Sequence, residues 1–193
     1  MSAPSAARAQ AQLVALLQLA FSGEKAAAWA YRGHAASLGD ACERERIRAI
    51  EQEEWQHRTR LGEMLLELGA SPRRLNELRA AMIGRTLGAL CHVCGRFLPM
   101  YGAGRLESRN IREYETAARL ALACGREAWV DCLLTMAEVE WEHEKWFRDR
   151  VLAHWIGARI RLWPEPAARS TIRDSMPGRT RAAERPPEVA LNR

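Results

Sequence analysis

The chain has 193 residues, which fits a single domain with a substantial buried core. Hydrophobic residues make up 48% and charged residues 27%, as expected for a soluble or peripheral globular protein. No uncharged apolar run approaches the roughly 20 residues needed to cross a bilayer, which excludes a membrane-spanning protein. Much of the net charge of +5 lies beyond residue 157 in an arginine-rich tail, so nucleic-acid binding is not expected from it.

The cysteines indicate a reducing compartment. Their number, five, is odd, and no secretory signal peptide is recognisable, so we expect free thiols and a cytoplasmic protein. Cys91 and Cys94 form a lone Cys-x-x-Cys pair. Because a rubredoxin-type iron centre needs two such pairs, we interpret these residues as two thiols one helical turn apart.

The first half of the chain predicts two long helices. Residues 1–5 are expected to be disordered, and the apolar spacing from Ala6 to Ser37 is helical. Asp40 with Glu43 resembles a capping box and predicts the start of a second helix. That helix is expected to run to about Leu68, before Gly69.

A long connection separates this pair from two further helices. Residues 72–104 have helical character, and the sequence predicts that Pro99 and Gly102–Gly104 break it. We expect helices from about Arg105 to Cys124 and from about Arg126 to Ile156. Residues 6–163 would then form one bundle, and residues 164–193 a disordered tail rich in Arg and Pro. Four core helices with one long crossover predict an all-α, ferritin-like four-helix bundle.

Two of the four helices carry the same short pattern. Glu54 and His57 form one Glu-x-x-His pair on the second helix, and Glu140 and His143 form another on the last helix. Residues three apart share a helix face, so each pair can present a carboxylate and an imidazole together. Two such pairs predict the half-sites of a carboxylate-bridged di-metal centre. Glu51 and Glu53 remain alternatives to Glu54.

The other two helices should each supply one inward Glu. Glu24 is the single acid before Asp40, whereas the third helix offers Glu107 and two alternatives, Glu113 and Glu115. A repeated spacing favours Glu107, since Tyr31 follows Glu24 by seven residues and Tyr114 follows Glu107 by seven. Seven residues are nearly two turns, so each Tyr shares its Glu's face and is placed to hydrogen-bond a ligand on a neighbouring helix.

The predicted metal centre therefore has six ligands: Glu24, Glu54, His57, Glu107, Glu140 and His143. Its four carboxylates carry a charge of −4, which two divalent ions would neutralise. Oxygen-rich ligands with two imidazoles suit iron, with manganese as an alternative. In the usual arrangement of such sites, Glu54 and Glu140 would bridge the two ions.

These residues resemble the ferritin-like di-iron superfamily and, within it, the demethoxyubiquinone hydroxylase family most closely. The resemblance rests on Gly23-Glu24, on the run from Glu54 to Arg58 and on Gly102-Ala103-Gly104 before Glu107. It covers roughly residues 20–153. The arginine-rich tail and the arginines of the crossover depart from the family pattern.

The resemblance implies an oxygen-activating di-iron monooxygenase. It would use O₂ as co-substrate and an external electron donor to hydroxylate a lipophilic quinone precursor. The crossover resembles a membrane-facing element, so residues 75–104 are expected to contact a membrane surface, and the protein to lie on its inner face. In particular, Leu87, Leu90, Phe97, Leu98, Met100 and Tyr101 are expected there. A homo-oligomer is compatible with the sequence.

Two alternatives remain open. One is a ferritin- or rubrerythrin-like protein that oxidises iron or reduces peroxide with the same ligands. The other is a helical scaffold on a membrane surface without enzymatic activity.

Overall fold

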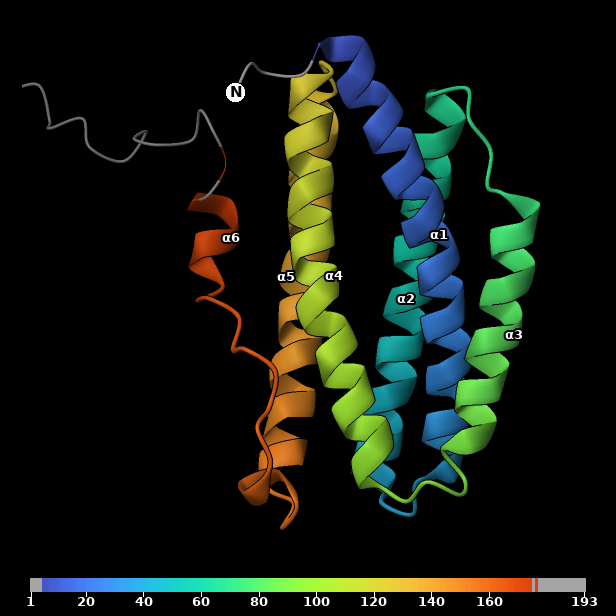
Figure 1. Ribbon diagram of the computed structural model, residues 1–193, viewed down its shortest axis with the longest axis vertical. Helices are drawn as coiled ribbons and strands as arrows, with labels where there is room; N and C mark the ends of the chain where they lie inside the picture. The colour runs from blue at the N-terminus through green and yellow to red at the C-terminus, as the bar shows by residue number, and fades with distance from the viewer. Residues whose placement is uncertain (1–4, 175, 177–193) are drawn as a thin grey trace, which may run out of the picture.

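Five long helices make up most of the computed structural model, which describes residues 5–174 and 176 (Figure 1). They are followed by a short 3₁₀ turn, Gly157–Arg159, and a last short helix. The helices are α1 (Ala6–Ser37), α2 (Ala41–Glu67), α3 (Arg74–Leu90), α4 (Phe97–Ala123), α5 (Glu127–Leu152) and α6 (Ser170–Asp174). The predicted all-α, ferritin-like class is confirmed.

Four of the helices form the bundle. α1 packs antiparallel to α2, α4 packs antiparallel to α5, and α1 also contacts α4 (Figure 1). The connection between the two pairs contains α3, which lies outside the bundle against α1.

A layer of acids and histidines divides the apolar core into two parts. One part holds Leu17, Leu61 and Ala137, and the other holds Ala27, Ile50 and Phe147. On each of the four bundle helices, the predicted ligands lie in the chain between members of these two parts. Since burying unpaired charge is costly, a polar layer across the middle of a bundle must serve something other than packing.

Glycine contacts hold α3 close to α1. A Cβ atom at Gly84 would lie 2.4 Å from the carbonyl oxygen of Ala26, and one at Gly33 would lie 2.4 Å from Cα of Gly88. The small residues of α3 therefore face the bundle, and its large apolar residues face outward. The outward set, all exposed by 44% or more, is Leu75, Leu78, Met82, Ile83, Leu87 and Leu90.

The crossover differs from the prediction in the position of its break and in the burial of Met100. The break falls between Cys91 and Arg96, and α4 begins at Phe97, ahead of the predicted start at Arg105. Pro99 does not break the helix because it is the third residue of α4, where a backbone N–H has no partner within the helix. Gly102 and Gly104 also lie within α4, and Met100, predicted to face a membrane, is buried.

The segment after α5 folds back along that helix (Figure 1). Trp163 is buried against Gly104, where a Cβ atom would lie 2.5 Å from the indole ring, and Ile172 is buried in the core. The prediction of disorder from residue 164 is therefore wrong for residues 164–174, because these few apolar side chains find partners on α4 and α5. Residue 175 and residues 177–193 of that predicted tail lie outside the described residues.

Among the residues that the structure describes, no helix is long and apolar enough to span a membrane.

Candidate metal centre

All six predicted ligands lie together in the middle of the bundle. They come from all four bundle helices, and none is more than 6% exposed. α1 supplies Glu24, α4 supplies Glu107, and α2 and α5 each supply a Glu and a His: Glu54, His57, Glu140 and His143.

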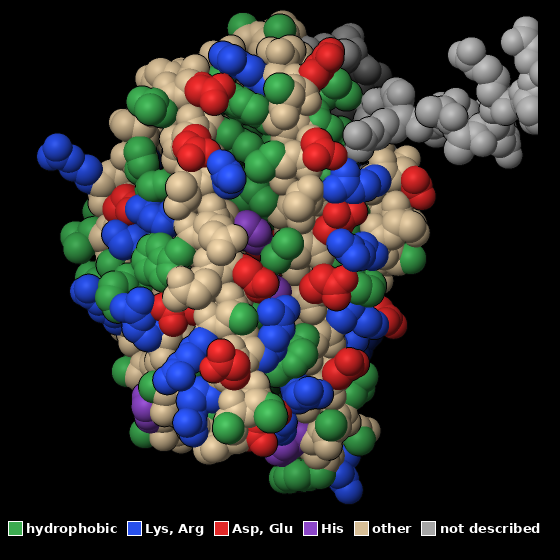
Figure 2. Space-filling view, turned by 180° about the vertical axis from the view of Figure 1, so that it is seen from behind, with side chains coloured by type: hydrophobic (Ala, Val, Ile, Leu, Met, Phe, Trp, Pro, Cys, Tyr) green, Lys and Arg blue, Asp and Glu red, His purple; other side chains and the backbone are tan. Residues whose placement is uncertain are grey.

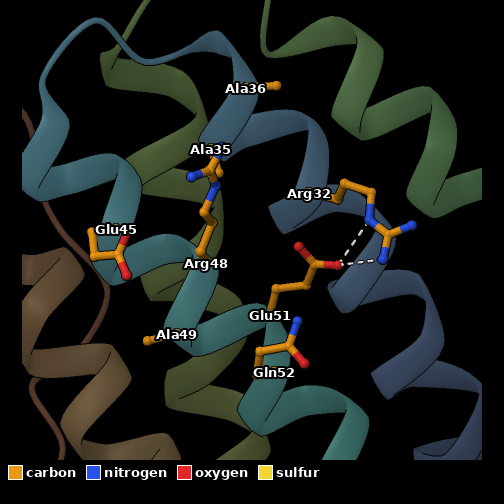
Figure 3. A pocket seen from close by; sticks show the side chains of 8 residues that line it. All are labelled: Arg32, Ala35, Ala36, Glu45, Arg48, Ala49, Glu51 and Gln52. Carbon is orange, nitrogen blue, oxygen red and sulfur yellow. Dashed lines mark hydrogen bonds and ion pairs between the residues drawn. The ribbon is translucent and has the colours of Figure 1, made fainter.

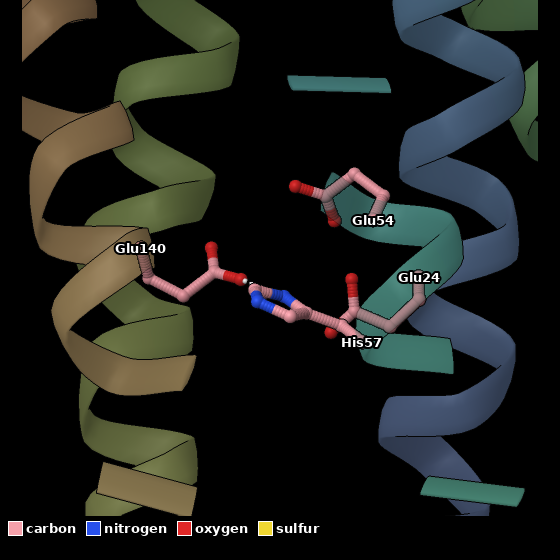
Figure 4. Close-up of side chains that lie close together, drawn as sticks. All are labelled: Glu24, Glu54, His57 and Glu140. Atoms are coloured by element: carbon pink, nitrogen blue, oxygen red, sulfur yellow. Dashed lines mark ion pairs between the residues drawn. The ribbon is translucent and has the colours of Figure 1, made fainter. Parts of the chain in front are cut away.

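The ligand atoms form two overlapping groups, in each of which all atoms lie within 4.8 Å of one another. The first group is Glu24, Glu54, His57 and Glu140 (Figure 4), and the second is Glu54, Glu107, Glu140 and His143. Glu54 and Glu140 belong to both. The geometry thus describes two adjacent positions, each with one His and one Glu of its own and with two carboxylates shared between them.

The polar atoms of this layer fit metal ions better than they fit one another. Both carboxylate oxygens of Glu54, Oε2 of Glu24 and Nδ1 of His143 are buried without a hydrogen-bond partner among the described residues. Nδ1 of His57 lies 3.0 Å from Oε1 of Glu140 (Figure 4), yet their geometry is not that of a hydrogen bond. Buried polar atoms are rarely left in this state, and a bound cation would satisfy them.

Burial and mutual repulsion perturb the protonation of these acids. Burial, and next the charges of Glu24 and Glu140, raise the pKa of Glu54 well above its usual range. Burial also raises the pKa of Glu140 to about 8, and burial with the charge of Glu140 raises that of Glu107. The cluster therefore favours a source of positive charge.

Two tyrosines cross between α1 and α4. Tyr31 on α1 donates a hydrogen bond to Oε1 of Glu107 on α4, and Tyr114 on α4 donates one to Oε1 of Glu24 on α1. Burial, followed by the neighbouring carboxylates, raises the pKa of both phenols, so both remain donors at neutral pH. The equal seven-residue spacing in the sequence thus corresponds to a reciprocal pair of contacts.

The two positions differ in the contacts around them. Nδ2 of Asn110 lies 3.1 Å from Oε2 of Glu107 and 3.3 Å from Oε2 of Glu140. Oε2 of Glu53 lies 2.6 Å from Nε2 of His143. Both contacts stabilise the Glu107–His143 position. Within the described chain, the two side chains that belong to the Glu24–His57 position alone receive one hydrogen bond of this kind, from Tyr114 to Glu24.

Sequence reasoning missed Asn110 and treated Glu53 only as an alternative ligand. Asn110 lies three residues after Glu107 and therefore on its face, a signal that was available. Of the alternative third-helix acids, Glu113 lines a pocket beside Glu24, and Glu115 lies 4.0 Å from Arg119.

An apolar pocket of about 350 Å³ opens between α1, α3 and α4. Small residues create its space, and Tyr31, which bonds Glu107, is part of its wall. We call it the apolar pocket; it is lined by Ala27, Ala30, Tyr31, His34, Leu87, Leu90, Cys91, Cys94, Leu98, Pro99, Gly102, Ala103 and Leu106.

A second pocket, of about 250 Å³, lies beside it and reaches Glu24 directly. We call it the Glu24 pocket. It shares Ala27 and Leu106 with the apolar pocket, and its polar lining includes Asn110 and Glu113. A hollow of about 500 Å³ between α1 and α2 is instead lined by charged residues such as the exposed Arg32 and the buried Glu51, which form an ion pair there (Figure 3). Its lining, within the described chain, includes no ligand of the metal centre.

Comparison with known proteins gives one match. A protein-family model described as ubiquinone biosynthesis protein COQ7 matches residues 11–114, which is 104 of 193 residues. The matched segment contains Glu24, Glu54, His57 and Glu107, whereas α5 lies outside it. Searches of curated proteins and of solved structures found no match.

Proposed function

Because the chain belongs to the COQ7 family of ubiquinone biosynthesis, whose members are di-iron hydroxylases of the demethoxyubiquinone type, we propose that its six buried ligands hold two iron ions. We also propose that the protein hydroxylates a lipophilic quinone precursor in the apolar pocket. The observation that carries the proposal is a direct link between pocket and centre. Tyr31 lines the pocket and donates a hydrogen bond to the ligand Glu107.

In this proposal the two iron positions share Glu54 and Glu140. Glu24 and His57 complete one position, and Glu107 and His143 the other; manganese would fit the same ligands. When bound, two ferrous ions would supply electrons and open coordination positions for the reduction of O₂, and an external electron donor would return the oxidised ions to the ferrous state.

The residues of the chain hold this chemistry in a dry, fixed environment. The apolar core above and below the polar layer excludes water, and Tyr31 and Tyr114 hold two ligand carboxylates in place from opposite helices. Asn110 fixes Glu107 relative to the shared Glu140. Such contacts around a metal orient its ligands and tune its affinity.

The outward face of α3 suits delivery of a lipophilic substrate. Leu87 and Leu90 are exposed on this face and also line the apolar pocket. In Figure 2, hydrophobic and basic side chains lie next to each other along the edge of the molecule where α3 runs. Exposed leucines flanked by arginines favour binding to an anionic membrane surface, so we place the protein on the inner face of a membrane.

Two glycines allow the pocket assignment to be tested. Gly102 lines the apolar pocket and Gly23 lines the Glu24 pocket; a Cβ atom at either would meet no atom within 4 Å in the described structure. Both lie in helices, where replacement of Gly is favourable for helix formation. Gly102→Leu and Gly23→Leu therefore each add apolar volume to one pocket from a position where Cβ meets no steric conflict.

The experiment compares the two variants with the wild-type iron-loaded protein in O₂-dependent hydroxylation of a demethoxyquinone. We expect Gly102→Leu to raise KM by at least tenfold while iron content stays at two per chain, and Gly23→Leu to have a smaller effect. If Gly23→Leu abolishes turnover and Gly102→Leu leaves KM unchanged, the substrate does not occupy the apolar pocket. An iron content below one per chain in the wild type would refute the ligand assignment itself.

A further inference from the structure

The apolar pocket contains one buried polar atom that the metal centre does not use. His34 lines the pocket, is 2% exposed, and its Nε2 has no hydrogen-bond partner within the described chain. The other buried polar side chain of the lining, Tyr31, already donates its hydroxyl to Glu107. An aromatic or aliphatic side chain would fill this place without leaving a polar atom unpaired.

His34 and Tyr31 lie side by side on the same face of α1. They are three residues apart, and both rings stack against Phe147 of α5, with centroid distances of 6.4 Å and 5.7 Å. A ring held in the pocket beside His34 therefore lies next to Tyr31, whose hydroxyl contacts an iron ligand.

The surroundings keep the imidazole neutral. Burial lowers the pKa of His34 to about 4; the nearby charge of Glu43 opposes this effect and that of Arg96 adds to it. A neutral imidazole nitrogen accepts or donates one hydrogen bond according to its tautomer.

We propose that Nε2 of His34 hydrogen-bonds a ring oxygen of the ligand in the apolar pocket, and so selects a lipophilic molecule with an oxygenated aromatic or quinonoid ring over a plain hydrocarbon. The inference rests on the proposed function, because it takes the apolar pocket as the substrate site. It adds that the ring, rather than the apolar chain, occupies the part of the pocket next to Tyr31. His34 is thus a positioning residue for the ring.

Selectivity follows from the cost of an unpaired polar atom. A ligand without the oxygen leaves Nε2 unpaired in an apolar site, and a penalty of this kind corresponds to roughly tenfold in affinity. The quantity to measure is the ratio between the dissociation constants of a ligand without the ring oxygen and of one with it. A change in the size of the pocket would affect both constants alike and leave this ratio unchanged.

The test uses para-hexylphenol and hexylbenzene, which differ by one ring oxygen, with the full-length protein under nitrogen. Dissociation constants are measured by calorimetry for wild type, His34→Phe, His34→Leu and His34→Gln. We expect His34→Phe, which keeps the stack on Phe147, to reduce the preference for the phenol about tenfold. His34→Leu is a second variant, needed if the bulkier Phe impairs folding, and it should reduce the preference for the phenol by the same factor. His34→Gln, which keeps a hydrogen-bonding group, should retain most of the preference.

An unchanged preference in both His34→Phe and His34→Leu would overturn the inference. Gly102→Leu separates this from failure of the pocket assignment, because it should weaken both ligands equally. If both ligands still bind Gly102→Leu as they bind wild type, the pocket is not the site, and the role of His34 fails with it.

Discussion

Glu53 on α2 and His143 on α5 meet across the bundle, with 2.6 Å between Oε2 and Nε2. Arg46 approaches the same carboxylate oxygen at 3.4 Å. Burial would raise the pKa of Glu53, but the hydrogen bond and charge of His143, with the charge of Arg46, lower it below its usual range. The contact leaves Nδ1 of His143 facing Glu54 and Glu140, which is the orientation a metal ligand needs.

Removal of this carboxylate should weaken one of the two metal positions. In Glu53→Ala the imidazole of His143 loses the acceptor that fixes its orientation, and contacts of this kind are typically worth about 10–100-fold in metal affinity. We expect a ferrous or cobaltous titration to show one site weakened to this extent and the other little changed. Glu45→Ala is the control, because Glu45 is an exposed acid on the same helix. Equal affinities in the two variants would contradict the role of Glu53.

Asn110 should act on the same position. Asn110→Leu keeps the size of the side chain and removes the contacts to Glu107 and Glu140. Hydrogen bonds to charged groups are worth about 1.5–3 kcal/mol, so the affinity for the metal ion at the Glu107–His143 position should fall roughly tenfold or more. Glu113→Gln is the matched control, since Glu113 lines the same Glu24 pocket but belongs to neither ligand group. If both substitutions change metal binding alike, the effect arises from the pocket and not from the amide.

The part of the centre that could be predicted from the sequence is the part that a single helix determines. Glu140 and His143 share a face because of their spacing, whatever the neighbouring helices do. The choice between Glu53 and Glu54 depends on how α2 is rotated toward α5, which no local pattern encodes. The structure places Glu54 inside the layer, fully buried, and Glu53 at its edge.

The fold shows the same division between local and long-range information. The bounds of α1 follow from local spacing, and the structure agrees with them. The outward face of α3 is set by glycine contacts with α1, and the order of residues 164–174 depends on Trp163 meeting Gly104 some 60 residues earlier in the chain. Contacts of this kind become visible only when the helices are placed side by side.

A buried ion pair of α5, to which Trp163 and Pro164 of the following segment also hydrogen-bond, should contribute to stability. Nη2 of Arg148 lies 2.6 Å from the fully buried Glu144, which also accepts a hydrogen bond from Nε1 of Trp163 at 2.7 Å. Arg148→Met leaves that carboxylate buried without its cation, which typically costs about 3–5 kcal/mol.

Urea unfolding measures this loss. The control is Lys145→Met, which removes a partner of the exposed Glu165 and should change the free energy of unfolding little, because water screens this pair. A loss in Arg148→Met as small as that of the control would mean that this buried pair does not contribute to stability.

The exposed face of α3 should bind anionic membranes. Leu78 and Met82 are each 60% exposed, so their replacement by Glu removes apolar area and adds negative charge without disturbing the core. We expect the double variant to lose flotation with vesicles of phosphatidylglycerol and phosphatidylcholine, whereas wild type floats in a salt-dependent manner. Glu at Leu19 and Leu66, exposed on α1 and α2, gives a matched control that should still float. Flotation of the Leu78–Met82 variant at the wild-type level would exclude α3 as the membrane contact.

His34 should make stability depend on pH below neutrality. Because its pKa is about 4 in the folded chain and about 6.5 when unfolded, the unfolded chain binds more protons between these values. The contribution of neutral His34 to the free energy of unfolding is therefore complete above pH 6.5 and is lost as the pH falls toward 4. Between pH 7.5 and 5.0 this group should account for about 2 kcal/mol of the decrease in unfolding free energy.

His34→Gln removes the titrating group, so its unfolding free energy should fall by about 2 kcal/mol less than that of wild type over the same range. Comparing the variant with wild type cancels the titration of the metal ligands, which both chains share. His92→Gln, at an exposed position, should reproduce the wild-type dependence. Parallel pH profiles for wild type and His34→Gln would show that the imidazole protonates in the folded chain as readily as in the unfolded one.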